Sequence, residues 1–135
     1  MKNSAADHQV EPVVVHEEAC VAEGWADPVS GGVQWWTLLS GDRTPSNALT
    51  CGVVEIGPGT GGVMIPHRHA QPEVYHILSG QGVVTIAGRA YPLREGATLF
   101  IPGGAEHSTR NTGTEPLRLF YVFAVDAIAE VAYES

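Results

Sequence analysis

Short apolar runs recur along the chain at intervals of roughly ten residues, each bounded by glycine, proline, asparagine or aspartate. Within the runs, apolar residues alternate with polar ones or fill every position, as in half-buried or fully buried strands. Helical periodicity is nearly absent, and only Glu17–Glu23 and Asp126–Val131 are predicted to form single helical turns. The predicted strands are Val13–His16, Val33–Leu39, Leu49–Ile56, Val74–Leu78, Gly82–Ile86, Arg89–Leu93, Thr98–Ile101, His107–Asn111 and Leu117–Val125. This pattern predicts an all-β antiparallel sandwich or barrel.

The chain is expected to be a single domain, because its 135 residues match the usual size of one. Loops stay short between Leu49 and Val125, and the 16 glycines and 9 prolines fit a turn-rich β-protein. We expect residues 1–32 to form an N-terminal arm or edge strand, residues 33–125 to form a β-barrel, and residues 126–135 to form a C-terminal tail.

The charge balance excludes several classes of partner. Seven basic residues stand against 15 acidic ones, a net charge of −8, whereas binding to a phosphate backbone needs clustered lysine and arginine. We therefore expect no nucleic-acid partner. No run of about 18 apolar residues is present, so no membrane-spanning helix is expected, and the polar start without an apolar signal segment favours the cytoplasm.

The run Gly57–Gly62 matches the G-x-G-x-x-G pattern of dinucleotide-binding loops. That pattern requires a following helix whose N-terminus holds the pyrophosphate. Here the next residues, Val63–Pro66, are expected to be extended and end in proline. We interpret the run as a glycine-rich turn.

The segment from Gly61 to Gly80 contains a candidate metal site. His67 and His69 are two residues apart, so in an extended chain both imidazoles point to the same side, and Glu73 follows after a short turn. Two imidazoles and a carboxylate converging on one point are typical of a site for a divalent metal ion. A fourth candidate ligand is His107, which begins a strand after a Pro-Gly-Gly turn. Taken alone, that histidine would be a weak candidate.

Two sequence patterns resemble the two signature motifs of the cupin superfamily, G-x5-H-x-H-x3-E-x6-G and G-x5-P-x-G-x2-H-x3-N. All their fixed positions are met, by Gly61, His67, His69, Glu73 and Gly80, then by Gly96, Pro102, Gly104, His107 and Asn111. One departure is Gly96-Ala97, where many cupins have Gly-Asp, and it affects a turn rather than a ligand.

The resemblance implies a single-domain cupin, a double-stranded β-helix or jelly-roll barrel, with a metal ion in its lumen bound by His67, His69, Glu73 and His107. Fe(II) or Mn(II) suits this ligand set best, and Ni(II) or Zn(II) is compatible with it. In an octahedral ion, four protein ligands leave two positions open for a small organic substrate, or for substrate and dioxygen.

The function expected from this site is that of a metal-dependent enzyme acting on a small organic metabolite, and we favour a dioxygenase or oxygenase. The alternatives are a redox-neutral lyase, isomerase, cyclase or decarboxylase in which the metal is a Lewis acid, and a non-enzymatic small-molecule-binding cupin. The sequence does not select the substrate, because one fold hosts many chemistries.

Tyr75 is the candidate catalytic residue. It lies two residues after Glu73, on the same face of the predicted strand, and its phenol is placed to act as a general base or as a hydrogen-bond donor to the substrate. Its position resembles that of a tyrosine in small cupin lyases that cleave dimethylsulfoniopropionate, although an E-x-Y pattern occurs widely among cupins. His76 alternates to the outer face and is not expected to be a ligand.

The strand Leu117–Val125 is largely apolar on both faces, which indicates a second layer against its outer side. Cupins commonly dimerise sheet on sheet. We therefore expect a homodimer.

Overall fold

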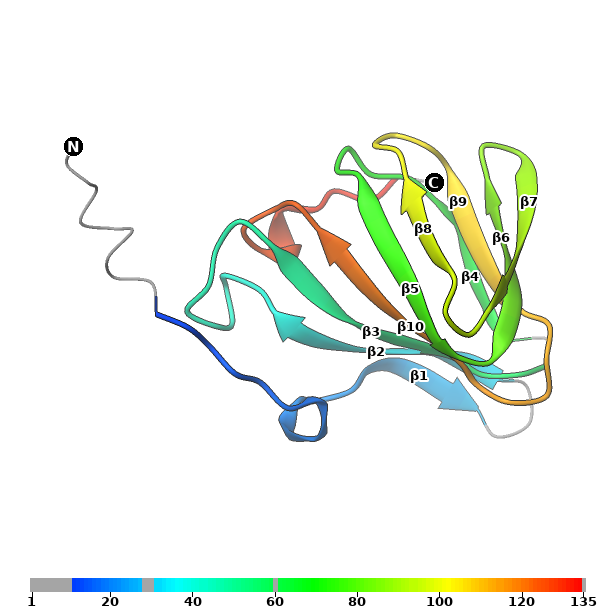
Figure 1. The fold of residues 1–135 in the computed structure, drawn as a ribbon, viewed down its shortest axis with the longest axis horizontal. Coiled ribbons are helices and arrows are strands. Elements are labelled where there is room, and N and C mark those ends of the chain that lie inside the picture. Colours follow the sequence, from blue (N-terminus) through cyan, green and yellow to red (C-terminus); the bar gives the residue numbers. More distant parts are fainter. Residues whose placement is uncertain (1–10, 28–30, 60, 135) are drawn as a thin grey trace.

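The strands of the computed structural model form two antiparallel sheets that face each other (Figure 1). The structure describes residues 11–27, 31–59 and 61–134. The large sheet has the order β1 (Glu23–Asp27), β2 (Gly31–Leu39), β3 (Thr50–Ile56), β10 (Leu117–Phe123), β5 (Glu73–Ser79) and β8 (Thr98–Ile101). The small sheet has the order β4 (Val63–His67), β9 (His107–Asn111), β6 (Gln81–Ile86) and β7 (Arg89–Arg94). This architecture confirms the predicted all-β jelly-roll barrel.

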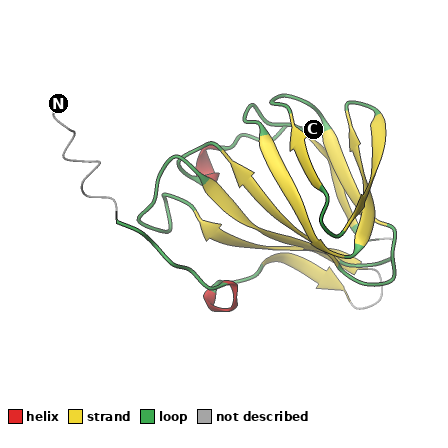
Figure 2. Ribbon diagram, viewed as in Figure 1, coloured by secondary structure: helices red, strands yellow, loops and turns green. Residues whose placement is uncertain are grey.

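Helical structure is confined to two single 3₁₀ turns, η1 (Glu17–Ala19) and η2 (Ile128–Glu130), in the described part of the chain (Figure 2). Both fall within the two segments predicted to form helical turns. Among the described residues, no helix is long and apolar enough to cross a membrane.

Eight of the nine predicted strands are present, each within two residues of its predicted bounds. The prediction of a strand at Val13–His16 is wrong. The alternation that suggested it is real, because Val13 and Val15 are half-buried while Val14 is exposed. The side chains of an extended segment can therefore alternate between buried and exposed even where its backbone pairs with no other strand.

Two strands were not predicted. The strand β1 has the sequence Glu-Gly-Trp-Ala-Asp, which lacks an apolar run, and it forms because its backbone pairs with β2. The strand β4 covers the segment that was expected only to be extended. In both cases the strand depends on a partner rather than on local propensity.

The strand β1 lies at one edge of the large sheet, within the segment expected to be an arm or edge strand. Residues 1–10 and 28–30 of that segment lie outside the described residues. The division of the chain into arm, barrel and tail stays a prediction.

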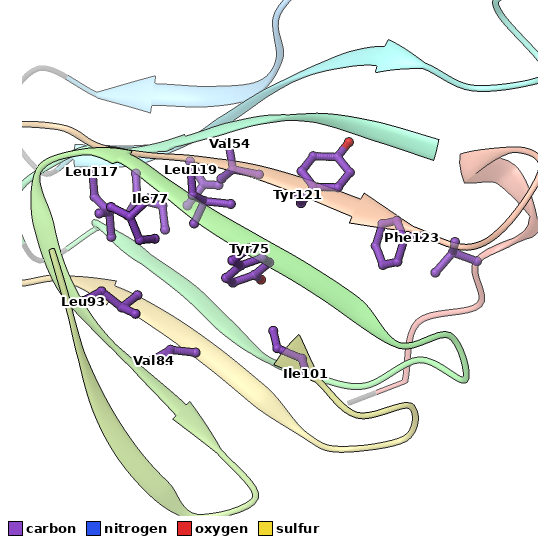
Figure 3. Close-up of a cluster of buried hydrophobic side chains, with 13 residues drawn as sticks. Val54, Tyr75, Ile77, Val84, Leu93, Ile101, Leu117, Leu119, Tyr121 and Phe123 are labelled. Atoms are coloured by element: carbon purple, nitrogen blue, oxygen red, sulfur yellow. The ribbon is translucent and has the colours of Figure 1, made fainter. Parts of the chain in front are cut away.

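The apolar core lies between the two sheets. Ile77, Leu117 and Leu119 of the large sheet are fully buried and belong to one cluster with Val84 and Leu93 of the small sheet (Figure 3). The register pairs Leu119 with Ile77 and, further along the same two strands, Phe123 with Glu73. The candidate ligand Glu73 therefore lies further along β5, toward the end of the barrel away from Ile77.

Replacing Ile77 by alanine should leave a cavity in this cluster. We expect Ile77→Ala to lower the free energy of unfolding by about 2–5 kcal/mol, measured by urea denaturation followed by tryptophan fluorescence. The control is Leu49→Ala, because Leu49 is 55% exposed and its truncation should cost less than about 1 kcal/mol. Equal losses for the two variants would contradict the assignment of the core.

Candidate metal centre

The four candidate ligands come from neighbouring elements at one end of the barrel. His67 is the last residue of β4 and lies directly opposite His107, the first residue of β9. His69 follows in the connection after β4, and Glu73 begins β5 in the other sheet. His107 opens a strand, as expected, and Glu73, one residue before the predicted start of its strand, is the first residue of β5.

These side chains converge. One ring nitrogen from each of His67, His69 and His107 lies within 4.8 Å of the others, and the rings of His67 and His107 have centroids 4.4 Å apart. The Oε1 atom of Glu73 lies 3.2 Å from Nε2 of His69 and 3.5 Å from Nε2 of His107. His69, Glu73 and His107 are buried, whereas His67 is half-buried.

Backbone carbonyls fix the orientation of all three imidazoles. In each ring Nδ1 lies within hydrogen-bonding distance of a carbonyl two residues away, and since a carbonyl only accepts, Nδ1 must be the protonated nitrogen. The accepting carbonyls of His67, His69 and His107 are those of Ile65, Gln71 and Ala105, at 2.8, 2.8 and 2.9 Å. With Nδ1 protonated, a neutral ring presents the lone pair of Nε2, the atom that would bind a metal ion. In His69 this atom lies 3.2 Å from Oε1 of Glu73, the proposed neighbouring ligand.

The motif residues after β8 support this arrangement. Gly104 has a φ of +79°, a conformation that favours glycine, and its N–H donates to the carbonyl of His69 at 2.8 Å. Buried Asn111 donates through Nδ2 to the carbonyls of Ile56 and Glu115, both at 2.8 Å, and its Oδ1 accepts from the N–H of Gly113. These motif positions hold the turns between the strands.

Burial and charge act differently on the titratable groups. Burial lowers the pKa of His67, which favours the neutral ring. Burial also acts to lower the pKa of His107, but the neighbouring Glu73 carboxylate outweighs it and leaves that pKa above its ordinary value. Burial, with the charge of Glu73, raises the pKa of the Tyr75 phenol well above its ordinary value.

The donor set fits a divalent cation. Within the described part of the chain, buried Nε2 of His107 has no hydrogen-bond partner, which is costly for a polar atom unless something else meets its lone pair. A cation bound among these lone pairs and the Glu73 carboxylate would satisfy them together. The structure therefore supports a divalent metal centre formed around the three histidines.

Tyr75 is fully buried on the same face of β5 as Glu73, and its ring centroid lies 6.4 Å from that of His107. His76 points to the outer face, where its Nδ1 lies 2.6 Å from Oγ1 of Thr98. The alternation along β5 thus follows the sequence pattern.

A cavity of about 640 Å³ opens onto these groups. His67, Glu73 and Tyr75 line it together with residues that sequence reasoning did not select, above all Tyr133 from the tail and the pair Glu23–Arg43. In that pair Nη1 of Arg43 lies 2.5 Å from Oε2 of Glu23, and the contact lowers the pKa of Glu23. No motif marks these three residues. They reach the cavity through strand pairing and the path of the tail.

The neighbouring Trp35 and Trp36 lie on opposite sides of the large sheet, because successive side chains of a strand point to opposite faces. Trp35 lines the cavity, whereas the ring of Trp36 lies beneath the Arg118 guanidinium, 5.5 Å from its centroid. The polar and aromatic walls of the cavity therefore extend over β1 and β2.

Comparisons with known proteins agree with this geometry. The cupin-domain family profile matches residues 52–123. The dimethylsulfoniopropionate lyase DddW of Ruegeria pomeroyi is 39% identical over 122 residues, which cover 90% of this chain and 78% of the lyase. The oxalate-binding protein of Thermotoga maritima is 31% identical over 93 residues, 68% of this chain and 75% of that protein.

A solved structure shares the fold. The crystal structure of a predicted oxalate decarboxylase from Thermotoga maritima superimposes with a TM-score of 0.70 at 28% identity, and the match covers 84% of this chain and 99% of that one. The family profile, the relatives and the shared fold all point to the family that the two sequence motifs indicated. The chain belongs to the cupin family.

Proposed function

We propose that this protein is a metal-dependent lyase that cleaves a small carboxylate-bearing substrate by a redox-neutral elimination. The observation that carries the proposal is the shared cavity. His67 and Glu73 of the metal centre and the buried Tyr75 all open into one space of about 640 Å³. A small metabolite in that space would meet an electrophile and a proton-transfer group at once.

His67, His69, Glu73 and His107 are the proposed metal ligands. Their mixed nitrogen and oxygen donors suit Fe(II) or Mn(II), and Ni(II) or Zn(II) is also compatible. A divalent ion at this position would supply Lewis-acid chemistry, binding the substrate carboxylate and withdrawing charge from it.

The cavity wall suggests the substrate class. Five aromatic side chains line it, and aromatic faces attract positively charged onium groups. They are those of Trp35, Tyr75, Tyr121, Phe123 and Tyr133. Dimethylsulfoniopropionate, named for the 39% identical relative, carries a sulfonium and a carboxylate in one small molecule. It is therefore the substrate we propose.

In the proposed reaction Tyr75 moves the proton. Burial and the Glu73 charge disfavour its phenolate, and a divalent ion held by the neighbouring ligands would offset both effects. The phenolate takes a proton from the carbon next to the carboxylate, the electron pair of that C–H bond forms a C=C bond, and the C–S bond breaks. Dimethyl sulfide leaves as a neutral molecule and acrylate remains, while Tyr75 is left as a phenol that returns its proton to water. No oxidant or reductant is needed.

The oxygenase favoured from the sequence stays a prediction. The same four ligands would suit an oxygenase. No feature of the cavity, however, favours dioxygen over a second substrate atom at the open position of the metal ion. The decisive difference is that an elimination proceeds without dioxygen.

The outer face of the large sheet supports the proposed homodimer. Phe100 on β8 is 64% exposed and lies opposite Val74, which in turn lies opposite Val122 of β10. Val74 and Val122 are half-buried, so the row is an apolar strip with Phe100 projecting from it. Such a strip fits the same face of a second copy related by a twofold axis. We also propose that the protein acts in the cytoplasm.

Elemental analysis tests the metal centre. We expect protein purified without a histidine tag to carry about one equivalent of iron or manganese per chain by inductively coupled plasma mass spectrometry. The double variant His67→Ala/His107→Ala should lose the metal because two of four ligands are gone, whereas His76→Ala, which alters an outer-face histidine, should retain it. Absence of metal in the wild type after reconstitution would contradict the proposed centre.

The lyase proposal is tested by gas chromatography of dimethyl sulfide released from dimethylsulfoniopropionate in sealed vials. We expect turnover with and without dioxygen, and a loss of at least about 100-fold in Tyr75→Phe, because proton transfer contributes that much in many enzymes. Tyr91→Phe, a change on the far strand β7, is the control. Undiminished turnover in Tyr75→Phe would remove its catalytic role, an oxygen requirement would favour the oxygenase, and binding without turnover would favour a binding protein.

Light scattering tests the homodimer. We expect a dimer for the wild type and a monomer for Phe100→Glu, because a buried unpaired carboxylate at the centre of an apolar interface is unfavourable. Tyr91→Glu on β7 should remain dimeric. A monomeric wild type would contradict the proposal.

A further inference from the structure

The residues after β10 form a pinned segment, residues 126–134, which we name the C-terminal strap. Its first part is anchored to the loop after β2. The N–H of Gly41 donates to the carbonyl of Asp126 at 2.7 Å, and the N–H of Ile128 donates to Oγ of Ser40 at 2.8 Å. Val131 is buried in the core cluster. The strap therefore has a defined path over the barrel end rather than a free one.

The end of the strap is fastened to the backbone between two candidate ligands. Arg68, which separates His67 from His69, donates its N–H to the carbonyl of Glu134 at 2.7 Å. Its own carbonyl accepts from the N–H of Glu134 at 2.8 Å. In Figure 1 the tail, in red, crosses from the end of β10 toward this end of the barrel. The strap thus fixes the backbone between His67 and His69, on which the orientation of both imidazoles depends.

This attachment places Tyr133 against the site. Its ring centroid lies 5.5 Å from that of His67 and 5.5 Å from that of His69, in edge-to-face geometries. The ring also lines the cavity that Glu73 and Tyr75 open into. Yet Tyr133 is 52% exposed, so one side of it faces solvent and the other faces the candidate ligands.

A half-exposed tyrosine is a poor contributor to the core, because it leaves much of its apolar surface in water. The same side chain is well placed to form part of the cavity wall. It lies between solvent and two of the imidazoles, and its edge-to-face contacts restrict how those rings turn. Two backbone hydrogen bonds between the adjacent Glu134 and Arg68 hold it there.

We propose that the C-terminal strap is part of the metal site, and that Tyr133 is a positioning residue that holds His67 and His69 and closes the cavity over a bound carboxylate substrate. This inference rests on the metal centre of the proposed function. Tyr133 slows the release of the ion and the escape of the substrate, without taking part in proton transfer.

Metal release tests this directly. Co(II)-loaded protein, whose visible absorption reports the surroundings of the ion, is treated with excess EDTA, and the decay of the absorption is followed. We expect release to be about fivefold to tenfold faster in Tyr133→Ala, with a shifted spectrum, and within about twofold of wild type in Tyr133→Phe, which keeps the ring. Tyr91→Ala, a similarly exposed tyrosine on β7, should behave as wild type.

A second variant separates the strap from the ring. Glu134→Pro keeps Tyr133 but removes the N–H that donates to the carbonyl of Arg68, so release should again be faster. With dimethylsulfoniopropionate as the probe, Tyr133→Ala should raise KM about tenfold and change kcat less than about threefold, because the contact holds substrate and does not transfer the proton.

The outcomes are distinct. A wild type that binds no Co(II) overturns the metal centre of the proposed function and this inference with it. A wild type that binds Co(II) but releases it at the same rate as Tyr133→Ala and Glu134→Pro overturns the role of the strap alone. Faster release in Tyr133→Ala that Tyr133→Phe does not restore would also overturn the role of the ring.

Discussion

The pairing of β4 with β9 is the constraint on which the candidate site depends, because its register places His67 directly opposite His107. A slip of one residue would turn one of these imidazoles to the other face of the sheet. The backbone then completes the arrangement, since a carbonyl two residues from each histidine engages Nδ1 and fixes the orientation of the ring. Glu73 reaches the same point from the facing sheet. The site therefore depends on the strand register within the small sheet and on the large sheet that faces it.

The sequence predicted this part well, and the reason is local. The two-residue spacing of His67 and His69, and the positions of Glu73 and His107 at strand starts, follow from backbone geometry that few neighbours can change. Most strands were also visible, because alternation and turn residues coincide in them. The exception at Val13–His16 shows the limit of that signal. The alternation there reflects partial burial of every second side chain. A strand also needs the free edge of a neighbouring strand to pair with, and alternation does not report that.

The rest of the cavity could not be predicted, because its residues meet only through long-range packing. Glu23 lies on β1, whose sequence has no strand signal and which exists through its pairing with β2. Arg43 follows β2 in a loop and meets Glu23 across 20 residues of sequence. Tyr133 stands in a short tail and is placed by two hydrogen bonds to Arg68. Neither spacing nor composition distinguishes such residues from ordinary surface positions.

The position of β10 in the large sheet limits how the chain can fold during synthesis. This strand is the last in the sequence, yet it lies between β3 and β5 and bonds to both. Without it the large sheet is two unconnected pieces with exposed edges, which invite pairing with other chains. An emerging polypeptide therefore cannot close its barrel until residues 117–123 have left the ribosome. Until then the edges of β3 and β5 stay open to pairing with other chains.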